Sequence, residues 1–198
     1  MAFHRNADYV ISAGTVTFHP RTQDVLVILN KKYGEDIWQL PKGRRNIGED
    51  ICDAAVRETY EETGYHVRLS TVRILTRATR PRGYLPPEAG EAPVTTSACG
   101  LNQHHQNQID DLGNEPVGMV TYTDPLTEAG AHANKMCFFF LATLADPDAA
   151  PHEHTQDVGE QLEAKWMRVV DARLALRFDA EREVLVSAEA HWTRAASA

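Results

Sequence analysis

The chain has 198 residues, of which 42% are hydrophobic and 24% charged, so it can bury a core and lacks the composition of a disordered tail. Its 28 acidic and 20 basic side chains give a formal net charge of -8, which argues against a long nucleic-acid track or an anionic membrane surface as a partner. The longest apolar run, 136–144, is shorter than the roughly 20 residues that span a bilayer.

Two further features bear on where the protein resides. The first residues lack the apolar stretch of a signal peptide. The three cysteines form no Cys-x-x-Cys pair, and their odd number suits reduced thiols. We therefore expect a protein of the cytoplasm, with the nucleus as the other compartment that fits. No segment predicts an oligomer interface.

Strands and one clear helix are predicted in the first third of the chain. Residues 12–18 and 25–29 have the composition of strands, and the second is fully apolar and therefore expected to be buried. Residues 37–40 form a short extended piece that a proline stops. A helix is predicted over 50–62, because this segment opens with acidic residues, contains no Gly or Pro, and meets Gly64 where a C-terminal cap belongs.

The rest of the chain alternates strands with loops. Three segments have the apolar pattern of strands: 63–87, 136–144 and 166–170. The segment 84–118 is rich in Pro, Gly, Gln, Asn and His, and predicts an irregular insertion. A C-terminal helix is predicted over 179–192, with Asp179 as its N-cap. Because no linker divides the chain, we expect one mixed α/β domain over 1–198, with helices covering a sheet.

Three glutamates on the first predicted helix share one of its faces. Glu58, Glu61 and Glu62 are spaced i, i+3 and i+4. A divalent cation that prefers hard oxygen ligands, Mg²⁺ or Mn²⁺, would relieve their mutual repulsion, and Arg57 can reach Glu61 to orient the cluster. Small residues at 54–55 are expected to leave room above the carboxylates. A solvated acidic face is the alternative interpretation.

The spacing around these glutamates follows a fixed order. It runs from Gly43 through five residues to Glu49, through seven more to Arg57-Glu58, and through two more to Glu61-Glu62, with Gly64 one residue later. This order resembles the Nudix box, the signature of the Nudix hydrolase family, at each invariant position. Thr59 and Tyr65 depart from the aliphatic residues that the family prefers. The flanking 38–43 also resembles the family, and the likeness is architectural over about 8–192.

The resemblance implies a fold, a reaction and a site. The fold is the Nudix fold, in which a mixed β-sheet is sandwiched between helices (α/β/α). The reaction is hydrolysis of a nucleoside diphosphate, or another pyrophosphate, linked to a moiety X. Glu58, Glu61 and Glu62 would hold Mg²⁺ or Mn²⁺ with the backbone carbonyl of Gly43, and Glu49 would pair with Arg57. The implied catalytic set is Glu49, Arg57, Glu58, Glu61 and Glu62.

The general base has two possible origins by this resemblance, because Nudix enzymes take it either from the box or from a later loop. Glu58 or Glu62 would serve in the first case. In the second case Glu160 and Glu163 are the outside candidates, followed by Glu153 and Glu128.

A basic patch in this acidic chain suggests a substrate with many phosphates. The predicted substrate-binding cations are Lys31, Lys32, Lys42, Arg44, Arg45, Arg80 and Arg82. Tyr84 is added by resemblance, because some diadenosine polyphosphate hydrolases carry a tyrosine near this place that stacks on adenine. The Leu-Pro-Lys-Gly sequence at 40–43 resembles the branch that acts on diadenosine polyphosphates and diphosphoinositol polyphosphates. Pyrophosphatases of ADP-ribose, nucleotide sugars or oxidised nucleotides are the alternative, and a non-catalytic nucleotide-binding Nudix-fold protein is an alternative of another class. The expected partner is a small polyphosphate molecule.

Overall fold

The structure, a computed structural model, describes residues 9–31, 35–72, 74, 115–124, 133–156, 159 and 161–196. Within these residues, strands and helices follow one another in this order: β1 (Tyr9–Phe18), β2 (Val25–Asn30), β3 (Ile37–Gln39), β4 (Lys42–Arg44), α1 (Ile51–Thr63), β5 (Val67–Leu69), β6 (Gly118–Asp124), β7 (Ala133–Leu144), β8 (Leu162–Met167), α2 (Val169–Ala175) and α3 (Asp179–Ala196). No described helix is long and apolar enough to cross a bilayer.

The strands form one mixed sheet. Its main path runs β3-β2-β1-β7-β5, while β4 pairs with β1, β6 with β7 and β8 with β2. β1 and β7 run parallel over ten residue pairs, from Tyr9 opposite Asn134 to Phe18 opposite Thr143, and the remaining pairs are antiparallel. The central strands are covered on both faces, which is why residues 12–18 and 25–29 are buried without alternation.

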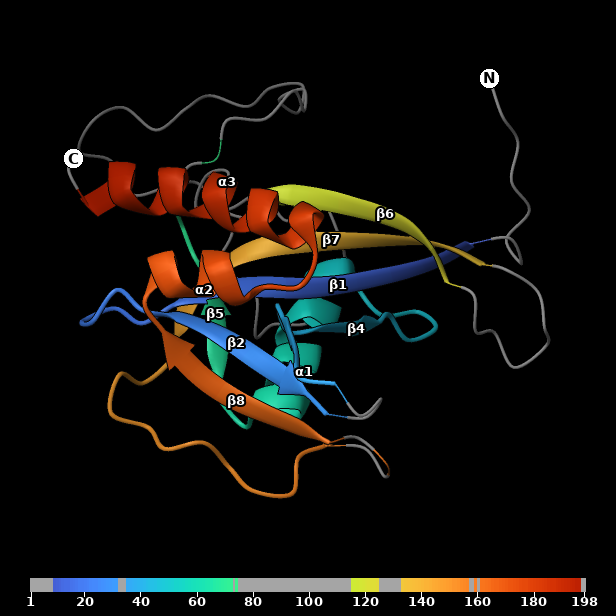
Figure 1. Cartoon of the computed structure of the whole chain (residues 1–198), viewed down its shortest axis with the longest axis horizontal. Coiled ribbons are helices and arrows are strands. Elements are labelled where there is room, and N and C mark those ends of the chain that lie inside the picture. Colours follow the sequence, from blue (N-terminus) through green and yellow to red (C-terminus); the bar gives the residue numbers. More distant parts are fainter. Residues whose placement is uncertain are drawn as a thin grey trace.

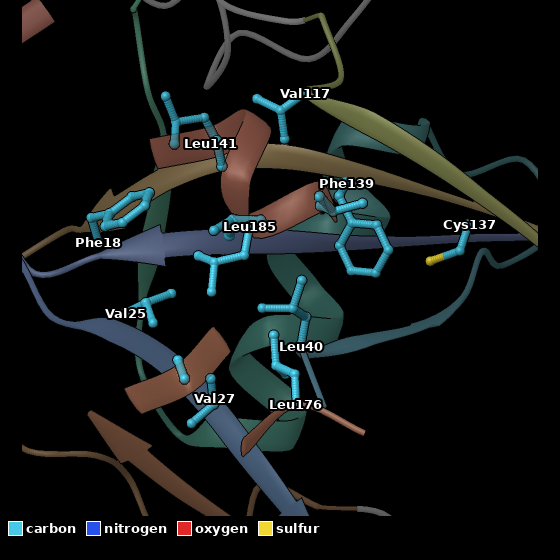
Figure 2. Packing of buried hydrophobic residues seen from close by; sticks show 14 of the residues in the cluster. Phe18, Val25, Val27, Leu40, Val117, Cys137, Phe139, Leu141, Leu176 and Leu185 are labelled. Atoms are coloured by element: carbon cyan, nitrogen blue, oxygen red, sulfur yellow. The ribbon is translucent and has the colours of Figure 1, made fainter. Parts of the chain in front are cut away.

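Helices cover both faces of the sheet, with α2 and α3 on one side and α1 on the other (Figure 1). Side chains alternate along β1, so Val16 and Phe18 join the core under α3 while Ala13 joins the core under α1. Figure 2 shows the core under α3, where Phe18, Phe139 and Leu141 of the sheet meet Leu185 of that helix. The observed layers are those of the expected α/β/α sandwich.

In the core under α1, the helix contributes small buried residues. Ala54 and Ala55 are fully buried and pack with Phe140 and Ala142 of β7. The expectation that these alanines leave room above the carboxylates is wrong, because they face the sheet. Their small side chains instead let α1 approach the strands closely.

Several expected boundaries need correction. Residues 42–44, beyond the proline that was expected to stop the extended piece, form strand β4, and 118–124 form β6. Of the arginine-rich stretch 63–87, the described part contains only one short strand, 67–69, and most of 84–118 lies outside the described residues.

The predicted late strand over 166–170 is half wrong. β8 ends at Met167, and α2 begins at Val169. Two β-branched valines favour a strand locally, but Ala172 and Leu176, spaced i and i+4, bury completely in the core under α3. Tertiary packing therefore overrides local propensity.

Asp179 is not the N-cap of α3. The carbonyl of Phe178 accepts the amide of Arg182, which puts Phe178 at the capping position. Asp179 lies in the first turn, where its carboxylate pairs with Arg182 and complements the helix dipole.

Candidate active site

Helix α1 has well-defined ends. The side chain of Asp50 accepts the amide of Cys52 at 2.8 Å, and Gly64 ends the helix in the left-handed conformation at φ 75°. The following loop comes back to the same end, since the hydroxyl of Thr155 donates to the carbonyl of Glu61 at 2.8 Å. The side-chain amide of Gln156 lies 3.5 Å from the carbonyl of Glu62. The last turn of α1 is therefore held by this loop.

Hydroxyl groups also fix α1 against β1. Thr59 is fully buried, its Oγ1 lies 2.8 Å from Oγ1 of Thr15, and it donates to the carbonyl of Ala55 at 2.7 Å. Thr15 in turn contacts the hydroxyl of Thr17 at 2.7 Å. Thr59 is one of the two departures from the Nudix pattern, and here a hydrogen-bonded contact replaces an aliphatic one.

Arg57 is the centre of a charge network at the acidic face of α1. Its Nε donates to Oε1 of Glu49 at 2.7 Å and its Nη2 to Oε2 at 2.9 Å, which is a bidentate pair. Its Nη1 donates to Glu58 at 2.8 Å and to Glu61 at 2.6 Å. A further bond from Nη2 reaches the carbonyl of Arg44 at 2.9 Å, so one guanidinium joins the loop, β4 and the helix.

This network shifts the pKa values of its members. The hydrogen bond from Arg57 is the main cause that lowers the pKa of the Glu49 carboxyl, with a smaller contribution from the Asn46 amide. The same bond is the first cause that raises the pKa of Arg57, opposed by burial and reinforced by Glu58. Both groups are thus held in their charged forms.

A pH dependence of stability follows from Glu49. Because its pKa is lowered in the folded protein, the pair stabilises above the unfolded value, and this contribution is lost as the pH falls through the folded pKa. We expect Glu49→Gln to melt below wild type at pH 7, with the difference in Tm shrinking as the pH is lowered from about 4.5 into the acid range. Thermal unfolding at several pH values measures this, and a difference that stays constant over that range would contradict the charged pair.

The glutamates lie directly over strand β4. Glu62 is only 8% exposed, and its Oε2 accepts the amide of Lys42 at 2.8 Å. A Cβ added to Gly43 would lie 1.7 Å from Oε2 of Glu58. Only a residue without a side chain allows the Glu58 carboxylate to lie this close to the strand.

The donor set suits a divalent cation in its chemistry. The carboxylates of Glu49, Glu58 and Glu61 contact the guanidinium of Arg57, and the carboxylate of Glu62 accepts the amide of Lys42, so four carboxylates lie along this face. Within the described part of the chain no three acidic, His or Cys side chains already converge as a metal site, and Nη1 of Arg57 binds both Glu58 and Glu61. Hard carboxylate oxygens beside a strand carbonyl are the ligand type that Mg²⁺ and Mn²⁺ take.

Residues 8–92 match the family model of the NUDIX domain. The chain contains a Nudix domain. Nudix hydrolase 7 of Arabidopsis thaliana is 39% identical over 62 residues, which cover 30% of this chain and 22% of that protein. An 8-oxo-(d)GTP phosphatase of Mycolicibacterium smegmatis is 46% identical over 68 residues, 34% of this chain and 20% of that protein. The matched part thus spans about a fifth of the length of these relatives.

Solved structures extend the likeness to the whole Nudix fold. A NUDIX hydrolase from Nitrosomonas europaea superposes with a TM-score of 0.54 at 16% identity, covering 92% of this chain and 89% of that one. A C. elegans Ap4A hydrolase also gives 0.54, at 19% identity, over 93% of this chain and 98% of that one. The expected Nudix fold is confirmed.

The structure separates the predicted basic residues. Arg44 and Arg45 are exposed beside the Nudix glutamates, and Nη1 of Arg45 donates to the carbonyl of Glu49 at 2.7 Å. Lys42 instead turns its ammonium away, to Glu181 of α3 at 3.6 Å, and its side chain is only 14% exposed. Lys42 therefore does not present a cation to solvent. Four predicted substrate-binding residues lie outside the described residues: Lys32, Arg80, Arg82 and Tyr84.

The structure describes two of the outside candidates for a general base, Glu163 and Glu153. Glu163 lies on β8, exposed, with its Oε2 2.7 Å from Nζ of Lys31. That hydrogen bond lowers the pKa of the Glu163 carboxyl. Glu153 is exposed near His154. Glu160 and Glu128 lie outside the described residues.

Residues that the sequence did not single out also support the Nudix site. Thr155 and Gln156 hold the last turn of α1, and Glu181 holds the segment before Gly43. Their only sequence signals are ordinary ones, polar residues in a loop and an acidic residue in the first turn of a helix. These contacts connect segments more than 90 residues apart, which spacing alone does not reveal.

Proposed function

We propose that the protein is a metal-dependent pyrophosphohydrolase that cleaves a phosphoanhydride bond in a nucleoside diphosphate linked to another moiety X. The observation that carries the proposal is the acidic face of α1, where Arg57 binds Glu58 and Glu61, Glu58 lies over the side-chain-free Gly43, and Glu62 accepts the amide of Lys42. A merely solvated acidic face would not need a fixed guanidinium, a glycine beneath it and a buried Glu62.

The residues divide the work as follows. Glu58, Glu61 and Glu62, with the carbonyl of Gly43, would hold Mg²⁺ or Mn²⁺, and Glu49 with Arg57 keeps the loop and the helix in register. The bound cation would neutralise phosphate oxygens and lower the pKa of a water molecule. Glu58 and Glu62 are largely shielded from solvent, since 13% of the Glu58 side chain and 8% of Glu62 are exposed.

A base within the box is favoured over Glu163. The Lys31 ammonium already engages the Glu163 carboxylate, and a carboxyl with a lowered pKa is a weaker base. Glu58 and Glu62 lie on the acidic face itself, where the water would attack, and it is this position that favours them over Glu163, since Glu58 is likewise paired with a cation, Arg57. Glu160 remains the second outside candidate.

The substrate class we propose is a small polyphosphate, with diadenosine polyphosphates and diphosphoinositol polyphosphates first. Arg44 and Arg45 flank the glutamates, and the remaining proposed contacts are Lys31, Lys32, Arg80, Arg82 and Tyr84. The likeness to an 8-oxo-(d)GTP phosphatase keeps oxidised nucleotides as the alternative, together with ADP-ribose and nucleotide sugars.

A panel of substrates with product identification tests this order. It comprises diadenosine tetraphosphate, a diphosphoinositol polyphosphate, ADP-ribose and 8-oxo-dGTP, each with Mg²⁺ or Mn²⁺. We expect the highest kcat/KM for one of the first two. A preference for ADP-ribose or 8-oxo-dGTP would retain the metal site and remove the basic residues from substrate selection. Tight nucleotide binding without cleavage would identify a non-catalytic binding protein.

The exposed arginines give a separate prediction. Arg44→Ala and Arg45→Ala should mainly raise KM for the best substrate, each by about tenfold, because a charge-assisted bond to phosphate contributes about 1.5 kcal/mol. Steady-state kinetics measure this. Arg21→Ala is the matched control, since Arg21 is also exposed but pairs with Asp148. If Arg44→Ala and Arg45→Ala keep the KM of that control, neither arginine binds substrate.

A further inference from the structure

Helix α3 carries a buried carboxylate that the proposed reaction does not use. Glu181, in the first turn of α3, is only 3% exposed, whereas Glu183 two residues later on the same helix is exposed. Taking a carboxylate out of water is costly unless hydrogen bonds and an opposite charge compensate. A carboxylate retained there must have specific partners.

Both of its partners lie on the short segment that leads into Gly43. Oε2 of Glu181 accepts the amide of Leu40 at 2.9 Å, and Oε1 lies 3.6 Å from Nζ of Lys42. Leu40 directly follows β3, and Lys42 opens β4. The Glu181 side chain thus contacts the segment 40–42 at two points, although Glu181 lies 141 residues after Leu40 in the sequence.

Lys42 connects Glu181 with the acidic face of α1. Its ammonium faces Glu181, while its own backbone amide donates to Oε2 of Glu62 at 2.8 Å. The next residue is Gly43, over which Glu58 lies. The order of contacts is therefore Glu181, Lys42, Glu62, and it joins the two helical layers through β4.

The burial of both side chains supports this pairing. Only 14% of the Lys42 side chain and 4% of the Glu181 side chain are exposed, so bulk water compensates neither charge well. Their compensation comes from each other, from the Leu40 amide that donates to Glu181, and from the side-chain oxygen of Gln39 that accepts from Lys42.

We propose that Glu181 is a positioning residue. Through Leu40 and Lys42 it holds strand β4 in the position relative to α1 in which the carbonyl of Gly43 and the carboxylate of Glu62 can bind the same divalent cation. The proposal rests on the metal-dependent function proposed above. It assigns Lys42 to the positioning of β4 and takes it out of the set of cations that bind substrate phosphates.

The test compares Glu181→Gln with Glu189→Gln. The amide of the first variant keeps the acceptor for Leu40 but removes the charge that faces Lys42. Glu189 lies on the same helix and also loses an ion pair, that with Arg173, but it touches no part of β4. Mn²⁺ alone is titrated into each protein and the free ion is followed by electron paramagnetic resonance. We expect Glu181→Gln to raise the Kd for Mn²⁺ about tenfold, and Glu189→Gln to leave it unchanged.

Amide hydrogen exchange over 40–44 gives a second measurement that needs no metal. We expect faster exchange there in Glu181→Gln, at a temperature well below its Tm, and wild-type exchange in Glu189→Gln. Equal exchange in the two variants, or an unchanged Kd for Mn²⁺ in Glu181→Gln, would overturn the positioning role. If the wild type binds no Mn²⁺, the proposed function fails, whereas exchange over 40–44 still decides whether Glu181 holds β4.

Lys42→Met and the double variant Lys42→Met/Glu181→Gln separate positioning from substrate binding. If the two residues act as one unit, the double variant loses no more Mn²⁺ affinity than the more affected single variant. A Lys42→Met protein that binds Mn²⁺ as wild type does, but has a raised KM for its polyphosphate substrate, would return Lys42 to the substrate site and contradict the proposal.

Discussion

Replacing Glu62 by glutamine is expected to lower kcat by about 100-fold or more while the protein stays folded. The amide can still accept the hydrogen bond that Lys42 donates from its backbone, so the local structure persists, but a carboxylate is lost from the proposed cation site. Relief of repulsion from Glu58, four residues earlier, opposes any loss of stability. We expect Tm within about 3 °C of wild type.

Glu61→Gln should behave in the same way, and Glu183→Gln serves as the control for both. Glu183 is an exposed glutamate of α3 that lies outside the acidic face of α1. Steady-state rates at saturating Mg²⁺ and thermal unfolding of each variant are compared. If Glu62→Gln and Glu61→Gln turn over like Glu183→Gln, the acidic face of α1 is a solvated surface.

Gly43→Ala is expected to reduce activity by about 100-fold with little effect on stability. The new Cβ would lie 1.7 Å from Oε2 of Glu58, so that the carboxylate must move aside. The atom that moves is the end of a flexible side chain, which makes the cost to the fold small. A displacement of about 1 Å in a group that aligns reactants is enough to cost 100-fold in rate.

Gly14→Ala is the matched control for this substitution. Gly14 pairs with Lys42 on the neighbouring strand, and its new Cβ would lie 2.2 Å from the carbonyl oxygen of Pro41, which cannot move without the backbone. We expect a loss of about 2 kcal/mol in the free energy of unfolding. Chemical denaturation and kinetics of both variants check the contrast. A Gly43→Ala protein that unfolds as easily as Gly14→Ala, or that keeps full activity, would contradict the account of Glu58 over β4.

The candidate site was predictable because its residues are close in sequence. Gly43, Glu49 and Arg57 to Glu62 lie within 20 residues, and helical spacing alone places the three glutamates on one face. Runs of apolar and small residues predict the two central strands, at 12–18 and 25–29. Here local pattern and tertiary environment agree.

What the sequence missed depends on contacts between distant segments. Lys42 is a cation beside a glycine, which predicts a substrate contact. Only its ion pair with Glu181 of α3 shows that its ammonium is compensated within the protein. Ala54 and Ala55 likewise predicted only free space above the carboxylates, although they form the close contact of α1 with the sheet. The strand predicted at 166–170 gave way to α2 because burial of Ala172 outweighed the preference of two valines.

The central claim is that the acidic face of α1 hydrolyses a phosphoanhydride with a divalent cation. The most direct measurement is the rate of product release from diadenosine tetraphosphate, a diphosphoinositol polyphosphate, ADP-ribose and 8-oxo-dGTP, titrated with Mg²⁺ and with Mn²⁺, for wild type and Glu62→Gln. The account predicts cleavage of at least one substrate that requires the cation, stops with a chelator, and falls about 100-fold in the variant. Cleavage of none of them, or equal cation-dependent rates in both proteins, would contradict it.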